Sequence, residues 1–485
     1  MEQNARIDTL LISGILLILL SLLLGHQTRI AVAQGEREWP APIVLSDGIR
    51  DDAGEPTDSF RPVVVADAWG QAHAFWGSRT NPRRGVMGNV IYYARWNKWG
   101  WSEPKDVIVV GASNNQHAVP RAAVDSEGRL HLVWAKNGAL WYSRATVWNA
   151  TQVRAWAEPV LISDGPIMSG DSMMTMVTDT QNTIHVLFWM GNRSSATLVH
   201  TSSEKGESWS DPVAVTRSTG GNLVNASVDN GGRLHVVCNG NMYGSRGVYY
   251  TRSENLGLTW EDAVLIDRLD ERYTGQYFPH YINVIAREDK VHIAWHGTPR
   301  SQRWHQWSGD GGLTWNRPVQ ISSELVYLTN PPAMAFDGSD TLHLVSVGAG
   351  IQGAGGLWDT AVFHTTWRDG EWSQLELVSI AADERADIGI GNGDTLIAVW
   401  DQIDNADSAQ GGHFSILAST KELAGPSIPV KSSPPPEPTE TPVPTSNPTI
   451  TVTTHPRVTI SATRTAEIER SSRISVGLGG VFAAL

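Results

Sequence analysis

The sequence predicts an all-β protein, a propeller of four-stranded antiparallel blades. An alternating hairpin motif recurs about every 55 residues, which is typical of one propeller blade. A second hairpin follows most copies of the motif, and a histidine holds one fixed position in six of them. The seven copies are VADAWGQAHAFW ending at Trp76, AVDSEGRLHLVW ending at Trp134, VTDTQNTIHVLFW ending at Trp189, SVDNGGRLHVVC ending at Cys238, IAREDKVHIAW ending at Trp295, AFDGSDTLHLVS ending at Ser346 and IGNGDTLIAVW ending at Trp400.

The first hairpin of each repeat consists of two alternating apolar runs around a turn rich in Asp and Gly, as expected for a β-hairpin. Its histidines lie six positions after the turn Asp or its equivalent: His73, His131, His185, His235, His292 and His343. Because they belong to six different blades, no three of them can converge on one metal ion. We therefore expect each to form hydrogen bonds within its own blade, and we expect no metal and no cofactor.

The second hairpin carries paired aromatic residues or an alternating run, then a Trp, a small polar residue and often Pro. Its copies span 91–109, 140–163, 198–216, 248–266, 304–322 and 362–379. The missing seventh copy lies at the other end of the chain, where EREWPAPIVLSD (36–47) has the same Trp-x-x-Pro pattern. An N-terminal strand that completes the last blade would close the ring and remove a free sheet edge. We predict seven blades over residues 36–423, with six as the alternative count.

Three of the second hairpins contain a tighter motif, Ser-x-Asp-x-Gly-x-Thr-Trp, which resembles the Asp-box of the sialidase (BNR-repeat) superfamily. In such a turn Asp caps backbone amides, Gly takes a positive φ and Trp buries a large area. The resemblance implies a β-propeller in which the box is a turn on the face away from the active site. One box is complete and two are near matches: Ser308, Asp310, Gly312, Thr314 and Trp315; Ser253, Gly257 and Trp260; Ser202, Gly206 and Trp209.

The composition excludes several classes of protein. The formal net charge of −13 argues against nucleic acid as a partner. The single cysteine, Cys238, excludes an intramolecular disulfide, and we expect it to be a buried thiol.

The two ends of the chain indicate export. Residues 1–33 have the pattern of a signal peptide, and an uncleaved membrane anchor is the alternative. Residues 424–465 are rich in Pro, Thr and Ser and are predicted to form a disordered stalk. Residues 466–485 end in an apolar stretch that resembles a truncated membrane anchor. We expect an extracellular or cell-surface monomer that is attached to the membrane or cell envelope through its termini.

Arginines gather in the loops opposite the Asp turns. Two of them, Arg61 and Arg385, begin the innermost strands of blades one and seven, so ring closure should place them at the same mouth of the central channel. Guanidinium groups bind carboxylates with two parallel hydrogen bonds, which predicts an anion site. The alternative is a set of solvated arginines with no ligand. The candidate ligand-binding residues are Arg61, Arg385, His280, Arg84, Arg300 and Arg303.

The segment Phe60-Arg61-Pro62 resembles the early Arg-Ile-Pro motif of sialidases. In that family this arginine is the first of three that hold the carboxylate of sialic acid. The resemblance also implies an aspartate acid/base in the loop after the first hairpin, but residues 77–90 contain no Asp or Glu. A sialidase further needs a tyrosine nucleophile with a carboxylate beside it. Tyr273 next to Glu271 is the candidate pair, and Tyr327 near Glu324 is a second.

Since glycoside hydrolysis ordinarily needs a carboxylic acid, the missing aspartate argues against catalysis. The predicted function is therefore binding of a glycan or another anionic surface ligand without turnover. One alternative is an exo-α-sialidase-type glycoside hydrolase whose acid comes from Asp401, Asp404 or Asp407. The other is a protein–protein interaction scaffold.

Overall fold

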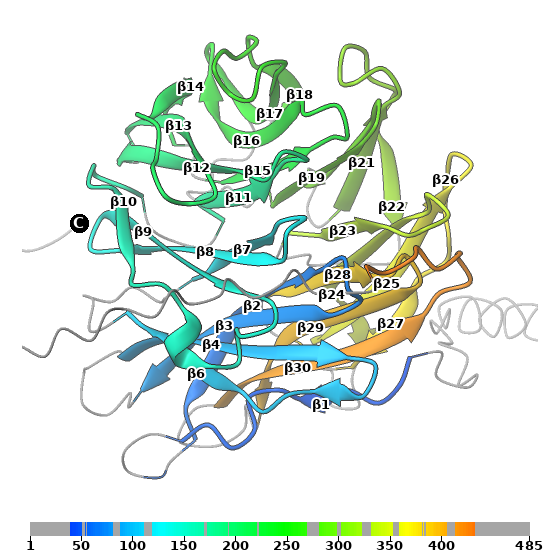
Figure 1. The fold of residues 1–485 in the computed structure, drawn as a ribbon. Coiled ribbons are helices and arrows are strands. Elements are labelled where there is room, and N and C mark those ends of the chain that lie inside the picture. Colours follow the sequence, from blue (N-terminus) through cyan, green and yellow to red (C-terminus); the bar gives the residue numbers. More distant parts are fainter. Residues whose placement is uncertain are drawn as a thin grey trace, which may run out of the picture. The chain divides into compact units, whose positions relative to one another are not determined.

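Seven antiparallel sheets follow one another around a ring (Figure 1). The computed structural model describes residues 39–50, 54, 56–80, 88–110, 119–168, 172–192, 194–220, 223–268, 281–297, 302–322, 331–352, 358–380, 382, 385–404 and 413–431. Within these residues the only helix is the short 3-10 turn Val153–Ala155. None of the described helical structure is long and apolar enough to cross a membrane.

In each blade the first strand lies innermost and the later strands follow outward. Blade 1 holds β2 (Asp58–Ala66), β3 (Ala72–Thr80), β4 (Gly88–Asn97), β5 (Gly100–Trp101) and β6 (Lys105–Val109). Blade 2 holds β7 (Arg121–Val124), β8 (Arg129–Lys136), β9 (Ala139–Thr146) and β10 (Val160–Ser163). Blade 3 holds β11 (Met174–Thr178), β12 (Thr183–Asn192), β13 (Ser195–Glu204) and β14 (Val213–Ser218). Blade 4 holds β15 (Val224–Val228), β16 (Leu234–Met242), β17 (Ser245–Ser253) and β18 (Val264–Arg268).

Blade 5 holds β19 (Ile282–Arg287), β20 (Lys290–Gly297), β21 (Gln302–Ser308) and β22 (Val319–Ser322). Blade 6 holds β23 (Ala333–Phe336), β24 (Leu342–Gln352), β25 (Trp358–Arg368), β26 (Glu371–Trp372) and β27 (Glu376–Ser379). Blade 7 holds β28 (Ala386–Gly391), β29 (Thr395–Asp404) and β30 (His413–Glu422), and its outer strand is β1 (Ile43–Val44) from the other end of the chain. Ile43 pairs with Ala418 and Val44 with Leu417. The predictions of seven blades and of closure by an N-terminal strand are both confirmed.

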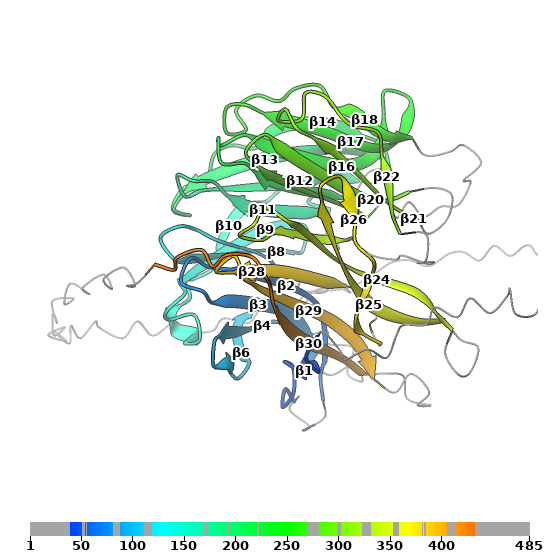
Figure 2. The ribbon, with the colours of Figure 1, turned by 90° about the vertical axis from the view of Figure 1, so that its right-hand side faces the viewer.

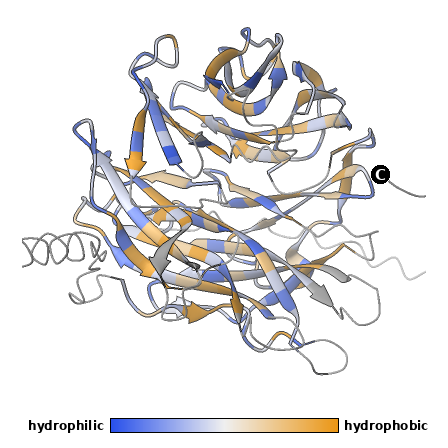
Figure 3. Ribbon diagram, turned by 180° about the vertical axis from the view of Figure 1, so that it is seen from behind, coloured by the Kyte–Doolittle hydropathy of each residue, from blue (hydrophilic) through white to orange (hydrophobic). Residues whose placement is uncertain are grey.

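The antiparallel order gives the ring two distinct faces. The Asp turns and the turns between the third and fourth strands lie on one face, which we call the turn face. The loops between the second and third strands, and those between blades, lie on the other, which we call the mouth face. Figure 2 shows the strands running between the two faces. Hydrophobic residues lie mainly along the strands (Figure 3).

The repeated histidines are buried and bonded within their blades, as predicted. His73 lies 3.2 Å from Asp67 through Nε2 and 2.8 Å from the hydroxyl of Tyr93 through Nδ1. A neutral imidazole satisfies both contacts by donating to the carboxylate and accepting from the hydroxyl. Blades 2 and 4 repeat the arrangement with Tyr142 and Tyr250. In blades 3, 5 and 6 a second histidine replaces the tyrosine: His200, His305 and His364.

A tryptophan of the following blade packs edge-on against each of these tyrosines or histidines. The ring centroids lie between 4.8 Å, for Trp315 against Tyr250, and 6.2 Å, for Trp156 against Tyr93. The last contact of this series joins blades 6 and 7, because Trp39 of the N-terminal segment that completes blade 7 packs 5.5 Å from His364 of blade 6. The other pairs are Trp209 with Tyr142, Trp260 with His200, and Trp372 with His305. Each such chain of side chains therefore joins two neighbouring blades.

The Asp-boxes place three of these tryptophans. In the complete box, the Ser308 hydroxyl accepts from the Gly312 amide at 2.9 Å, and the Asp310 carboxylate accepts from the Thr314 amide at 2.9 Å. Gly312 has a φ of 88°, and a Cβ there would collide with the hydroxyl of Tyr250 in the preceding blade. The box glycine is thus required by both its backbone conformation and its neighbour.

We predict that Gly257→Ala destabilises the propeller more than Gly370→Ala. Both glycines have positive φ, 86° and 90°, so both substitutions carry a backbone cost of roughly 1–2 kcal/mol. Only at Gly257 would the new Cβ also collide with a neighbour, the His200 ring, which adds an overpacking cost of about 1–3 kcal/mol. Urea unfolding of the two variants measures the difference, and equal losses would contradict the packing role of the box glycine.

Burial disfavours the charged form of three of the histidines in these hydrogen-bonded chains. It lowers the pKa of His200 to about 3, and of His292 and His343 to about 4. In the unfolded chain these histidines bind a proton once the pH falls below their ordinary pKa of about 6.5. In the folded chain they bind it only at a lower pH. The stability that the neutral histidines confer is therefore present above pH 6.5 and is lost as the pH falls toward 4.

We predict that His200→Tyr weakens this acid sensitivity. Tyrosine holds the equivalent position in blades 1, 2 and 4, so the substitution keeps the hydrogen-bonded chain while removing one titrating group. The loss of unfolding free energy between pH 7 and pH 4 should shrink by an amount on the order of 1–3 kcal/mol. Thermal unfolding across this pH range is the measurement. If the loss of stability between pH 7 and pH 4 is the same in the variant and the parent chain, His200 does not contribute to the acid sensitivity.

The propeller's contacts extend past residue 423, where the sequence placed the start of the stalk. On the turn face the Ile428 amide donates to the Asn392 carbonyl at 2.5 Å, and the Lys431 amide donates to the Ala68 carbonyl at 3.0 Å. The Lys431 ammonium also contacts the Ser126 carbonyl of blade 2. Residues 424–431 thus bind blades 7, 1 and 2. Residues 1–38 and 432–485, with the predicted signal peptide, the rest of the stalk and the tail, lie outside the described residues.

Candidate functional site at the channel mouth

Polar residues of four innermost strands line the channel and bind the next blade. Arg121, Asn225, Asn283 and Asp387 hold equivalent positions, each opposite the residue two after the histidine position. Each reaches the backbone of the following blade. The four contacts are Arg121 Nε to the Met174 carbonyl (3.2 Å), the Val284 amide to Asn225 (3.0 Å), Asn283 to the Pro332 carbonyl (2.8 Å) and the Val64 amide to Asp387 (3.0 Å).

The space that these strands enclose is small. A cavity of about 20 Å³ is lined by residues that include Arg121, Ser172, Arg385 and Asp387. This volume holds one or two water molecules. Arg121 begins β7 and Arg385 directly precedes β28, so both lie at the mouth-face end of the channel.

Arg61, in the innermost strand of blade 1, has an unusual backbone conformation. The residue lies in β2 with a φ of 58°, which is costly for a residue other than glycine, and the register of β2 against β3 shifts between Phe60 and Val63. Asp401 of β29 holds the strained residue, because its Oδ2 accepts from the Arg61 amide at 3.0 Å. Its Oδ1 accepts from the Arg385 amide at 2.7 Å. One buried carboxylate therefore positions the backbones of both arginines.

Two guanidinium-bearing residues, Arg121 and Arg385, line the cavity at the mouth. Desolvation, followed by the positive charges of Arg121 and Arg61, holds the pKa of Arg385 well below its usual value. Desolvation and the charge of Arg61 likewise lower the pKa of Arg121 to about 10. The Arg385 side chain also lies 3.4 Å from the hydroxyl of Ser172. Arg121 and Arg385 thus share one cavity, and Asp401 holds the backbone of Arg61 beside that of Arg385.

Among these described residues of the mouth, the arginines outnumber the carboxylates. Asp387 is the carboxylate that lies among the arginines, and desolvation raises its pKa although the arginines oppose this effect. Three arginines face Asp387 and Asp401, and both Asp401 oxygens already accept backbone amides. An anion at the opening would therefore relieve the repulsion among the guanidinium groups.

The structure brings together the two arginines that the sequence placed at the mouth, Arg61 and Arg385. Arg303 differs from the prediction: it lies in β21, is 1% exposed, and pairs with His296 and Ser322 in the sheet. Burial lowers its pKa to about 9. Four predicted ligand-binding or catalytic positions and one pair partner lie outside the described residues: Arg84, His280, Arg300, Tyr273 and Glu271.

Sequence reasoning missed Arg121, Ser172 and Asp387. Arg121 begins the innermost strand of blade 2, so the criterion that selected Arg61 and Arg385 also applies to it. The proposal of Asp401 as a catalytic acid does not fit its role as a double acceptor of backbone amides. Asp407, Glu324 and Tyr327 lie outside the described residues.

The comparisons with known proteins agree with this architecture. Residues 139–335, which run from β9 in blade 2 to β23 in blade 6, match the family model of the BNR repeat-like domain. A search of curated proteins found no match.

Solved structures with similar folds include sialidases and a lyase. Hadza microbial sialidase Hz136 is 13% identical with a TM-score of 0.43, over 76% of this chain and 66% of that chain, just under two thirds of its length. NanB sialidase from Streptococcus pneumoniae is 12% identical with a TM-score of 0.44, over 80% and 70%. Polysaccharide lyase Uly1 is 10% identical with a TM-score of 0.47, over 82% and 94%. Similarities at this level do not bear on the chemistry of the chain.

We predict that Asp401→Asn disturbs both arginines at once. An amide side chain has one acceptor oxygen, so one of the two backbone amides loses its partner, at a cost of about 1–3 kcal/mol. A matched control is Asp267→Asn in blade 4, where the carboxylate accepts from Trp295 at 2.8 Å. Both variants should unfold at lower urea concentration, but only Asp401→Asn should weaken carboxylate binding. If Asp401→Asn and Asp267→Asn weaken binding equally, Asp401 does not position the two arginines.

Proposed function

We propose that the channel mouth binds the carboxylate of an acidic glycan, with Arg61, Arg121 and Arg385 as the contacting residues. The observations that support this proposal most directly are that Arg121 and Arg385 line one small cavity and that Asp401 binds the backbone amides of both Arg385 and Arg61. Guanidinium groups form charge-assisted, bidentate hydrogen bonds with carboxylates. The small cavity beneath them limits the bound group to the end of a ligand, which suits a carboxylate on a sugar ring.

Binding without turnover is the function that we favour over hydrolysis. A glycosidase of the sialidase type needs an acid beside the leaving group and an activated tyrosine. Among the described residues at the mouth, Asp401 is engaged by two backbone amides and Asp387 lies among the arginines of the channel wall. A flat protein partner fits less well, since the charged groups converge in a narrow opening rather than over a broad surface.

The test is calorimetric titration of the full chain with N-acetylneuraminic acid and with glucuronic acid. Their methyl esters serve as ligands of nearly the same shape without the charge. We expect the acids to bind and the esters not to bind. Arg61→Ala and Arg385→Ala should each weaken binding roughly 10- to 100-fold, the equivalent of losing a charge-assisted hydrogen bond. Equal affinity for acid and ester would refute carboxylate recognition.

A fluorogenic sialoside separates binding from hydrolysis. We expect little or no turnover by the purified chain. Hydrolysis that both Arg61→Ala and Tyr273→Phe abolish would instead establish the sialidase-type enzyme. Binding that survives in Tyr273→Phe but not in Arg61→Ala, without turnover in the parent chain, is the result expected of a binding protein.

A further inference from the structure

A second basic depression lies on the turn face, between blades 2 and 3. Its volume is about 380 Å³, within the range of small-molecule pockets. Arg129 lies at the start of β8, Arg144 near the end of β9 and Lys205 in the turn after β13, so all three belong to the turn face. Arg154 and Trp156 come from the loop between β9 and β10. We call this depression the rim groove.

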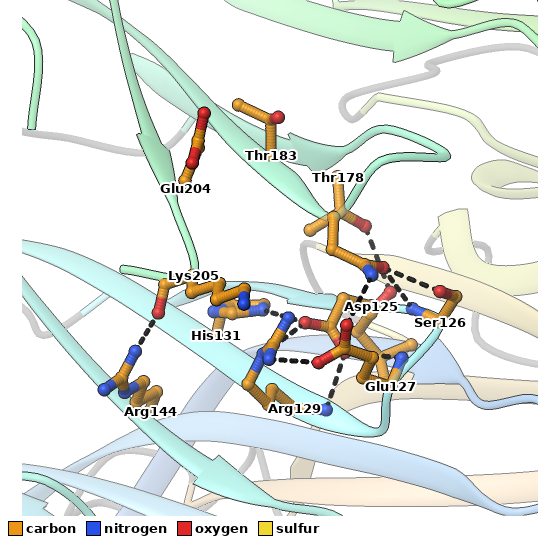
Figure 4. Close-up of polar contacts among 12 residues, drawn as sticks. Asp125, Ser126, Glu127, Arg129, His131, Arg144, Thr178, Thr183, Glu204 and Lys205 are labelled. Carbon is orange, nitrogen blue, oxygen red and sulfur yellow. Dashed lines mark hydrogen bonds and ion pairs between the residues drawn. The ribbon is translucent and has the colours of Figure 1, made fainter. Parts of the chain in front are cut away.

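The cations of the rim groove differ in how strongly they are paired with carboxylates. Arg129 is balanced by the buried Asp125 at 2.6 Å and by Glu127, as Figure 4 shows. Arg144 contacts the Lys205 carbonyl and lies 3.5 Å from Glu207, a carboxylate that is 70% exposed. Exposed ion pairs of this kind contribute little to stability and exchange readily with other partners.

Two further cations point to a ligand. Arg154 is exposed, and neither its guanidinium nor the Lys205 ammonium has an ion-pair partner among the described residues. Apart from Arg129, three positive charges therefore face one carboxylate, Glu207, in a chain whose formal net charge is −13. In addition, Nη2 of Arg129 is buried without a hydrogen-bond partner. A local positive field on an acidic protein concentrates anions.

We propose that the rim groove binds a sulfated or carboxylated sugar unit at a site separate from the channel mouth. The oxyanion would pair with Arg154, Lys205 and Arg144, displacing the weak contact to Glu207. The volume exceeds that of a bare oxyanion and accommodates a sugar ring, which would lie beside Trp156 and the small side chains of Ala155 and Ala157. The site stands independently of the function proposed for the mouth, because the two lie on opposite faces.

The experiment is calorimetric titration of the full chain at about 0.15 M ionic strength, where exposed charges are screened beyond roughly 8 Å. The probes are a sulfated disaccharide, a uronic acid disaccharide, a neutral disaccharide of the same size and inorganic sulfate. Binding of either charged disaccharide, with neither neutral sugar nor sulfate binding as tightly, is the expected result. The preferred charged probe then identifies whether sulfate or carboxylate is recognised.

Variants assign the site. The double variant Arg154→Gln/Lys205→Ala should weaken binding of the charged disaccharide about tenfold or more, since it removes charge-assisted hydrogen bonds. The matched control Lys98→Ala/Arg268→Gln removes two exposed positive charges elsewhere and should leave affinity nearly unchanged. With the sulfated disaccharide as the probe, Arg61→Ala at the mouth should also leave affinity unchanged. Failure of both charged probes to bind, an equal loss in the control, or a loss of sulfated-disaccharide binding confined to Arg61→Ala would each overturn the proposal.

Discussion

The propeller depends on one buried chain of side chains that is repeated from blade to blade. In its fullest form a turn aspartate, a histidine and a tyrosine are hydrogen-bonded in series, and a tryptophan of the next blade packs against the tyrosine. The histidine lies at the centre of the chain and uses both of its nitrogens, so the loss of either partner leaves a buried polar atom unsatisfied. Blade order and blade spacing are thereby fixed by a few specific contacts rather than by hydrophobic burial alone.

This constraint explains which parts of the fold were predictable from the sequence. The aspartate, histidine and tryptophan recur at a fixed spacing, so the seven blades, the closing N-terminal strand with Trp39 and the buried Cys238 followed from pattern alone. The extent of the C-terminal contacts did not. Residues 424–431 have a stalk-like composition, yet backbone groups of Ile428 and Lys431 bind the turn face, and such bonds leave no signature in side-chain chemistry.

The candidate site was predictable only in part, because the position of an arginine side chain depends on strand register as well as on the repeat. Arg61 and Arg385 were recognisable because ring closure makes blades 1 and 7 neighbours. Arg121 follows the same rule but lies in an otherwise ordinary strand start. Arg303 was predicted to bind a ligand because its neighbours in the sequence resemble a loop, but the structure places it inside the sheet of blade 5. Whether an arginine points into a channel or into a blade depends on register, which a single sequence specifies weakly at strand ends.

Ring closure and site formation are the same event in this molecule. Arg61 belongs to the first blade and Arg385 to the last, and Asp401 binds the backbones of both. Asp387 adds a second bond across the same boundary, to the amide of Val64. The junction that completes the ring thus also holds like charges close together, at a cost in repulsion that the rest of the ring must offset. In a chain in which blades 1 and 7 have not met, Asp401 cannot hold Arg61 beside Arg385, so the candidate site can exist only on the closed propeller.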